Sequence, residues 1–260
     1  MTEIIIHIFI FCFGAVVGSF LNVCIYRLPR KESIVRPGSH CPACKHEINW
    51  YDNIPFLSYL LLRRRCRHCR GKISFRYFLV ELLTAGLFLF LFKHFGSSAI
   101  FWVYLGLSSS LVVVSFIDID IREIPDEISL SGILIGMLIS VIFPQLQQTN
   151  LHSLALLRSF LGVLAGGGSI YLTGIIGDAI FKKESMGGGD VKLMGMIGAF
   201  IGWKLALLTF FLAPFFGAVV GITLKIKKGE SLIPYGPFLS LAALIAIVWG
   251  ERIINYLLYP

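Results

Sequence analysis

The sequence predicts an all-α polytopic membrane protein. Hydrophobic residues occupy 56% of its 260 positions and charged residues only 15%, and its mean hydropathy of +0.80 is far above that of a soluble domain. Apolar runs recur along the chain, and several approach the roughly 20 residues that a helix needs to cross a bilayer. The basic residues are concentrated in one early segment, which gives the chain a clear asymmetry of charge.

About eight apolar segments are expected to form transmembrane helices. In chain order they are 4–26, 78–95, 99–117, 127–143, 154–181, 191–202, 205–224 and 238–257. The sixth is short, so we expect it to be tilted or to begin inside the preceding loop. The first segment lacks a basic n-region and is long for the apolar part of a signal peptide, which favours a helix of the mature protein.

Small residues spaced four apart are common in these segments. Such pairs let membrane helices approach closely, although glycine is also simply frequent in membrane helices. The pairs are Gly14/Gly18, Gly132/Gly136, Gly162/Gly166, Gly198/Gly202 and Gly217/Gly221.

Segment 27–76 carries 12 of the 23 lysines and arginines, and the positive-inside rule therefore places it in the cytoplasm. Counting helices onward puts Lys182, Lys183, Lys225, Lys227 and Lys228 on the same side. The outer loops, around 96–98, 144–152 and 203, are poor in charge, and both termini fall outside. Anionic lipid headgroups are the expected partner of the basic segment, rather than nucleic acid.

Two Cys-x2-Cys pairs, separated by 21 residues, lie in this basic segment. Four thiolates at this spacing can close tetrahedrally around Zn²⁺, and four sulfur ligands leave no open position for catalysis. A reducing cytoplasm disfavours the alternative of disulfides. The chain is thus expected to have a first helix at 1–26, a zinc-knuckle domain at 27–76 and a membrane core at 77–260. The predicted ligands of a structural zinc are Cys41, Cys44, Cys66 and Cys69.

Three histidines flank these cysteines and are expected to be bystanders, or to contact the ligating cysteines, rather than to be ligands themselves. They are His40, His46 and His68. Between the two pairs, the apolar segment 50–62 is too short to span a bilayer. It could lie at the interface or re-enter it, with Trp50 and Tyr51 at headgroup depth, or form a hydrophobic plug beneath the knuckles.

Two aspartates stand where long apolar segments meet polar ones, and the predicted topology puts both at cytoplasmic helix ends. Asp118 precedes Asp120 by two residues, so on a helix these two side chains point in roughly opposite directions and only one can face a shared site. Asp190 follows three glycines, which let an extended peptide approach closely. Two carboxylates that share a proton and activate water are the chemistry of aspartic proteases, and ionisable groups at membrane depth are usually functional.

The other acidic residues of these segments have adequate structural explanations. Asp126 and Glu127 follow Pro125 and suit the positive N-terminal end of a helix. Asp178 is explained by solvation at a helix end or by pairing with a nearby lysine.

Several motifs together resemble those of the bacterial type IV prepilin peptidases, the prepilin leader peptidase/N-methyltransferases, and the likeness covers nearly the whole chain. The glycine-aspartate motif also resembles that of the wider G-x-G-D intramembrane aspartyl proteases. The matching stretches are GSFLNVCIYRLP at 18–29, the two cysteine pairs, Asn53-Ile54-Pro55, Arg76 with Glu81-Leu82, Asp118-Ile119-Asp120 with Ile124-Pro125-Asp126, and GGGDVKL at 187–193. Cys24 departs from the commoner aliphatic residue, and Asp120 stands where Asp and Glu vary.

The resemblance implies that Asp118 and Asp190 form the catalytic pair. The implied substrate is a prepilin or pseudopilin whose short basic leader ends in Gly and is cut on the cytoplasmic side of the bacterial inner membrane. It also implies N-methylation of the new N-terminus with S-adenosylmethionine, although no residues for the methyl donor are recognisable. If Asp118 ends one helix and Asp190 begins another, the helix dipoles favour Asp190 as the ionised base and Asp118 as the protonated acid.

Three other functions remain open at this point. A transporter or channel could bind a proton or cation at helix breaks. A lipid-headgroup enzyme could use Asp118 and Asp120 to hold a metal ion. A non-catalytic assembly factor of a secretion system would need neither aspartate. The sequence indicates neither the oligomeric state nor which pilus or secretion system is served.

Overall fold

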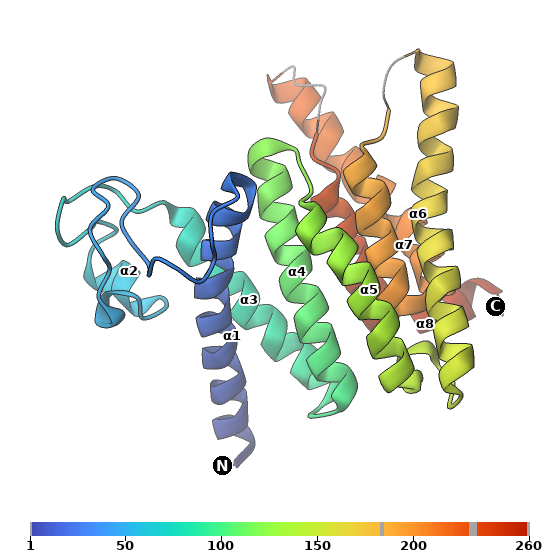
Figure 1. Ribbon diagram of the computed structural model, residues 1–260, viewed down its shortest axis with the longest axis horizontal. Helices are drawn as coiled ribbons and strands as arrows, with labels where there is room; N and C mark the ends of the chain where they lie inside the picture. Colours follow the sequence, from blue (N-terminus) through green and yellow to red (C-terminus); the bar gives the residue numbers. More distant parts are fainter. Residues whose placement is uncertain (1, 183–184, 229–232, 259–260) are drawn as a thin grey trace. The chain divides into compact units, whose positions relative to one another are not determined.

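The computed structural model describes residues 2–182, 185–228 and 233–258, and within them the chain is almost entirely helical. The long helices are α1 (Thr2–Arg27), α3 (Phe75–Phe95), α4 (Ala99–Ile121), α5 (Asp126–Ile142), α6 (His152–Phe181), α7 (Gly188–Lys228) and α8 (Gly236–Leu258) (Figure 1). The short elements are η1 (Leu28–Arg30), η2 (Trp50–Asp52), α2 (Leu57–Leu61) and η3 (Pro144–Gln147). The described residues contain no strand beyond two isolated β-bridges, so the predicted all-α class is confirmed.

Six of the described helices are long and apolar enough to cross a membrane: α1, α3, α4, α6, α7 and α8. This number differs from the expected eight for two physical reasons. Helix α5 has 17 residues, which at 1.5 Å per residue extend about 26 Å, slightly less than the hydrocarbon core. Helix α7 contains two of the predicted segments. Lys183 lies outside the described residues, as do the side chains of Lys225, Lys227 and Lys228.

Helix α7 is interrupted at Gly202, whose backbone has φ 75° and ψ 171°. An L side chain rarely adopts this conformation, so glycine is required there. The chain reverses at this point. Leu205 and Leu208, just after the break, lie against Gly250 near the end of α8, whereas Gly217 lies beside Phe238 near its beginning. The two predicted helices therefore exist, and the first begins at Gly188, inside the glycine run.

A buried polar cluster fills the break. Helix ends leave carbonyl groups without intrahelical partners, and buried ones need other donors. Gln147 of η3 donates from Nε2 to the carbonyls of Ala199 and Phe200, at 3.1 and 3.2 Å. The hydroxyls of Ser159 and Ser140 also donate to Ala199, at 2.7 and 3.2 Å. The interruption is thus closed by side chains of α5, η3 and α6.

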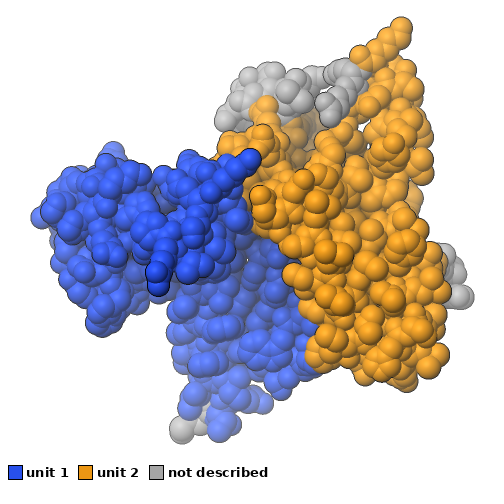
Figure 2. Space-filling model, viewed as in Figure 1, with its two compact units in different colours: residues 1–113 blue, residues 114–260 orange. Residues whose placement is uncertain are grey.

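Two compact units divide the chain, residues 1–113 and 114–260 (Figure 2). In the first unit, α1 packs on α3 through the predicted Gly14/Gly18 pair. A Cβ at either position would lie 2.8 Å from the backbone Cα of Ala85 or Glu81, so the helices touch backbone to backbone. Because of this interface, helices α1 and α3 fall in one unit with the cysteine segment that connects them.

In the second unit, α6 and α7 pack closely along each other (Figure 1). Their contact is built on the predicted glycines, because a Cβ at Gly162 would overlap the backbone carbonyl of Gly198. The Gly132/Gly136 pair of α5 likewise faces Met196 and Phe200 of α7. Since lipid offers no hydrophobic force between helices, close contact of small residues supplies much of the association.

Replacing Gly162 with alanine is expected to destabilise the protein by about 1–3 kcal/mol, because the methyl group forces α6 away from α7. Thermal unfolding in detergent measures the change as a lower Tm. Gly168→Ala on the same helix is the matched control, since a Cβ there meets nothing within 4 Å. Equal Tm values for the two variants would contradict this account of the interface.

Candidate active site and cysteine cluster

Asp118 lies in the last turn of α4 and is 5% exposed, whereas Asp120 is exposed. The helix ends three residues later, because Arg122 adopts a left-handed conformation with φ 58° and Pro125 cannot continue a helix. The amide of Arg122 donates to the carbonyl of Asp118 at 2.9 Å. As the two-residue spacing predicted, only one member of the Asp-x-Asp motif turns inward.

Asp190 lies in the first turn of α7 and is half-buried. Its amide donates to the carbonyl of Gly187 at 3.1 Å, which closes the glycine turn. A Cβ at Gly189 would lie 2.9 Å from Cβ of Ile124, so this glycine lets the turn pack against the connection between α4 and α5. A Cβ at Gly188 would meet nothing within 4 Å, so there is open space at this position of the glycine turn.

The second unit brings the two predicted carboxylates close enough for their charges to interact. They come from residues 72 positions apart, one at the end of α4 and one at the start of α7. Like charges at such a site cannot both be ionised without a cost.

The start of α8 contributes a third component of the site, which was not predicted from the sequence. The amide of Gly236 donates to Oδ2 of Asp118 at 2.7 Å. Tyr235 is half-buried, and its burial and the nearby Asp190 carboxylate raise the phenol pKa to about 12, so this hydroxyl keeps its proton. The sequence signal for this component was Tyr235-Gly236-Pro237 before an apolar run, a pattern that marks a turn and a helix start.

The other acidic groups have structural partners, as expected. Both carboxylate oxygens of Asp126 bind Nζ of Lys192, at 2.6 and 2.8 Å, which links the start of α5 to the first turn of α7. Oδ1 of Asp178 accepts the amide of Ser185 at 2.7 Å, so a backbone group occupies the place expected for a lysine.

In the first unit, the two cysteine pairs form knuckles of the same design. The amide of Cys41 donates to the carbonyl of His46 at 2.9 Å, and that of Cys66 to Gly71 at 2.8 Å. Lys45 and Arg70, each following the second cysteine of a pair, have left-handed backbones with φ 60°. Amide hydrogen bonds from Cys69 and His68 lower the pKa of the Cys66 thiol to about 7.

The four sulfur atoms converge, with all of them within 4.8 Å of one another and Cys41 Sγ 3.9 Å from Cys69 Sγ. A tetrahedral Zn²⁺ with 2.3 Å bonds separates its sulfurs by about 3.8 Å, whereas a disulfide needs about 2.05 Å. The donor set fits zinc and does not fit disulfides. The rings of His46 and His68 stack on each other with centroids 4.1 Å apart.

The segment between the knuckles packs on the membrane helices through one face. Phe56 stacks on Phe11 of α1 and contacts Phe78 of α3, at centroid distances of 5.8 and 5.5 Å, so one face is a plug. The other face is exposed, with Trp50 at 80% and Leu61 at 72%. This segment contains only the short elements η2 and α2.

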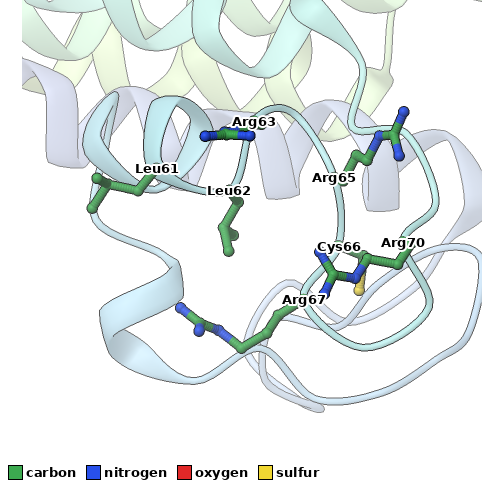
Figure 3. Close-up of a pocket in the computed structure, with 7 residues that line it drawn as sticks. All are labelled: Leu61, Leu62, Arg63, Arg65, Cys66, Arg67 and Arg70. Carbon is green, nitrogen blue, oxygen red and sulfur yellow. The ribbon is translucent and has the colours of Figure 1, made fainter.

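A basic cavity of about 600 Å³ lies between the end of α2 and the second knuckle (Figure 3). Its lining residues are Leu61, Leu62, Arg63, Arg65, Cys66, Arg67 and Arg70. Figure 3 shows Leu62 and Arg67 reaching toward the same space from these two elements. Arg67 binds both oxygens of Asp52 at 2.7 Å, and this hydrogen bonding lowers the pKa of that carboxyl. Among the described residues, no carboxylate pairs with the other three arginines.

Comparison with known proteins places these features in a family. The model of the bacterial peptidase A24 N-terminal domain matches residues 12–95, and that of the type IV leader peptidase family matches residues 105–222. No solved structure matches the chain significantly.

The similar proteins are prepilin leader peptidase/N-methyltransferases. The relative from Myxococcus xanthus (strain DK1622) is 42% identical over 86% of this chain and 64% of its own length, so the chain spans less than two thirds of that protein. The relative from Pseudomonas putida is 34% identical, and that from Neisseria gonorrhoeae 33%, each over 92% of this chain and 89% of the relative. The chain belongs to the type IV leader peptidase family, a family of proteases.

Proposed function

We propose that this protein is a membrane-embedded aspartic endopeptidase that removes the short basic leader of prepilins or pseudopilins after Gly, on the cytoplasmic side of the bacterial inner membrane. The observation that carries the proposal is the pairing of Asp118 and Asp190, whose charges interact although they belong to different helices. The names of the relatives supply the substrate class.

In this mechanism the two carboxylates share one proton and together bind a water molecule. The ionised carboxylate takes a proton from the water as it attacks the scissile carbonyl, and the protonated one donates to the carbonyl oxygen or the leaving amine. On the basis of the helix dipoles, Asp190 was expected to be the base. The amide of Gly236 opposes that assignment, because a hydrogen bond from the start of α8 favours the charged form of Asp118. The pair is therefore best treated as one titrating unit.

The membrane orientation suits such a substrate. Its apolar helix would lie in the bilayer beside the bundle, and its cationic leader would remain on the cytoplasmic side because basic residues resist translocation. The open space at Gly188, two residues before Asp190 in the chain, leaves room for an extended peptide backbone.

N-methylation of the new N-terminus is proposed from the names of the relatives. S-adenosylmethionine would supply the methyl group from its sulfonium centre. The basic cavity does not fit that centre, because its arginines repel a cation. We place no methyl-donor contacts there.

The cysteine cluster is proposed to bind one structural Zn²⁺ through its four thiolates, at the spacing described above. The metal would tie two knuckles together in a segment that has little helix or apolar core of its own, so that its binding energy becomes folding energy.

The basic cavity is proposed to hold the headgroup of an anionic lipid of the cytoplasmic leaflet. Arg63, Arg65 and Arg70 supply positive charge, and the exposed Leu61 of α2 lines the same cavity. An apolar surface next to basic side chains suits the boundary between acyl chains and headgroups.

The competing functions receive less support. A transporter would use a broken helix to bind ions, but the break in α7 is filled by Ser140, Gln147 and Ser159. An Asp-x-Asp metal site would need Asp118 and Asp120 on one side of α4, where only Asp118 is buried. A non-catalytic assembly factor would still complement a deletion when both Asp118 and Asp190 are changed to Asn.

Asp118→Asn and Asp190→Asn are each expected to lower kcat by at least about 10³-fold, because either change removes a group of the proton-sharing pair. Purified enzyme is incubated with a prepilin, and mass spectrometry of the new N-terminus reports cleavage and methylation together. Asp120→Asn is the matched control and should keep most of its activity. Cleavage by either variant of the pair at the control rate would refute the aspartic mechanism.

Cys66→Ser is expected to lower the zinc content of the purified protein from about one ion per chain toward zero, since three thiolates no longer complete the tetrahedron. Metal analysis by mass spectrometry provides the measurement. Cys12→Ser should retain the zinc, because this exposed cysteine of α1 lies outside the cluster. Metal-free wild-type protein with full stability would show that the cluster is not a structural zinc site.

Arg70→Gln is expected to weaken the retention of phosphatidylglycerol relative to phosphatidylcholine by about fivefold, since one basic side chain near a membrane contributes about 1 kcal/mol. Native mass spectrometry of the full-length protein counts the lipids that remain bound. Lys93→Gln, an exposed change in the last turn of α3, is the control for net charge. If both variants keep their zinc and retain as much phosphatidylglycerol as the wild type, the cavity is not a headgroup site.

A further inference from the structure

Every backbone amide hydrogen in the first turn of α8 has an acceptor, and one of these acceptors is the side chain of Asp118. The first four amides of a helix have no intrahelical acceptor and need partners elsewhere. The amides of Phe238 and Leu239 donate to the carbonyl of Tyr235, at 3.0 and 3.2 Å. Pro237 has no amide hydrogen. The remaining donor, the amide of Gly236, is buried and binds Oδ2 of Asp118 at 2.7 Å.

This hydrogen bond holds the Asp118 carboxylate from a second helix. The side chain extends from the end of α4, and its far oxygen is held by the beginning of α8, 118 residues later. A charge-assisted hydrogen bond from a backbone amide is short and directional, so it limits the rotation of the carboxyl group.

The same geometry leaves no room for a side chain at Gly236. A Cβ there would lie 2.8 Å from Oδ2 of Asp118 and 3.3 Å from its carboxyl carbon. These distances are shorter than ordinary van der Waals contact, so either the carboxylate or the start of α8 would have to move. The glycine is therefore matched to the position of the carboxylate.

We propose that Gly236 is a positioning residue of the protease, whose amide fixes the Asp118 carboxylate and whose missing side chain lets that bond form. This inference rests on the proposed aspartic mechanism and deepens it, because it assigns a role to the start of α8. Gly236 acts through Asp118 and contacts no substrate in this account.

The kinetic test compares Gly236→Ala with Gly168→Ala, where the added methyl group meets nothing within 4 Å. Displacement of a reacting group by even about 1 Å can cost about 100-fold in rate. We expect kcat for prepilin cleavage to fall by about that factor in Gly236→Ala, with KM and Tm close to those of Gly168→Ala. Retention of kcat by Gly236→Ala would overturn the inference, as would a loss explained by a lower Tm or a raised KM.

A second measurement does not depend on the folding of a Gly236 variant. Hydrogen–deuterium exchange of peptides covering 233–240 is compared between Asp118→Ala and Asp120→Ala. We expect Asp118→Ala to expose about one additional amide, because the acceptor of the Gly236 amide is lost. Equal exchange in the two variants would overturn the inference.

These experiments distinguish failure of the aspartic mechanism from failure of the positioning role of Gly236. Cleavage by Asp118→Asn at the wild-type rate would remove the aspartic mechanism and this inference with it. Inactivity of Asp118→Asn, together with normal kcat in Gly236→Ala, would remove only the positioning role.

Discussion

The hydrogen bond between the Asp118 carboxylate and the start of α8 connects the requirements of the fold to those of the site. A buried amide at a helix start needs an acceptor, and a buried carboxylate needs a donor. Each group satisfies the other at 2.7 Å. A change at either partner therefore affects both the capping of α8 and the orientation of a group that the proposed chemistry requires.

The second carboxylate depends on helix packing built from glycines. Asp190 can begin α7 close to Asp118 because the turn before it is glycine and because Gly189 packs directly on Ile124. Farther along, the reversal at Gly202 returns the chain toward the start of α8, and the side chains of Ser140, Gln147 and Ser159 satisfy the carbonyls that this reversal leaves open. Close backbone contact thus replaces the hydrophobic driving force that lipid cannot provide.

The first unit follows a different principle. Its knuckles contain few regular elements, and their shape is set by four convergent sulfur atoms and by the left-handed residues Lys45 and Arg70. Basic side chains and exposed leucines are gathered on the same segment. Such a surface is costly for a soluble domain but suits one that rests against lipid headgroups.

The sequence by itself determined the helical class, the positions of the long helices and the set of four clustered cysteines, because hydropathy and Cys-x2-Cys spacing are local properties. Helical periodicity also determined that only one of Asp118 and Asp120 turns inward, whereas the choice of Asp118 came from the family resemblance. Only the tertiary structure decided that α7 reverses through a buried polar cluster and that α8 completes the site. Those features join Gln147 to Ala199 and Gly236 to Asp118. No local pattern specifies which distant backbone group will meet a given side chain, since that depends on how all the helices pack together.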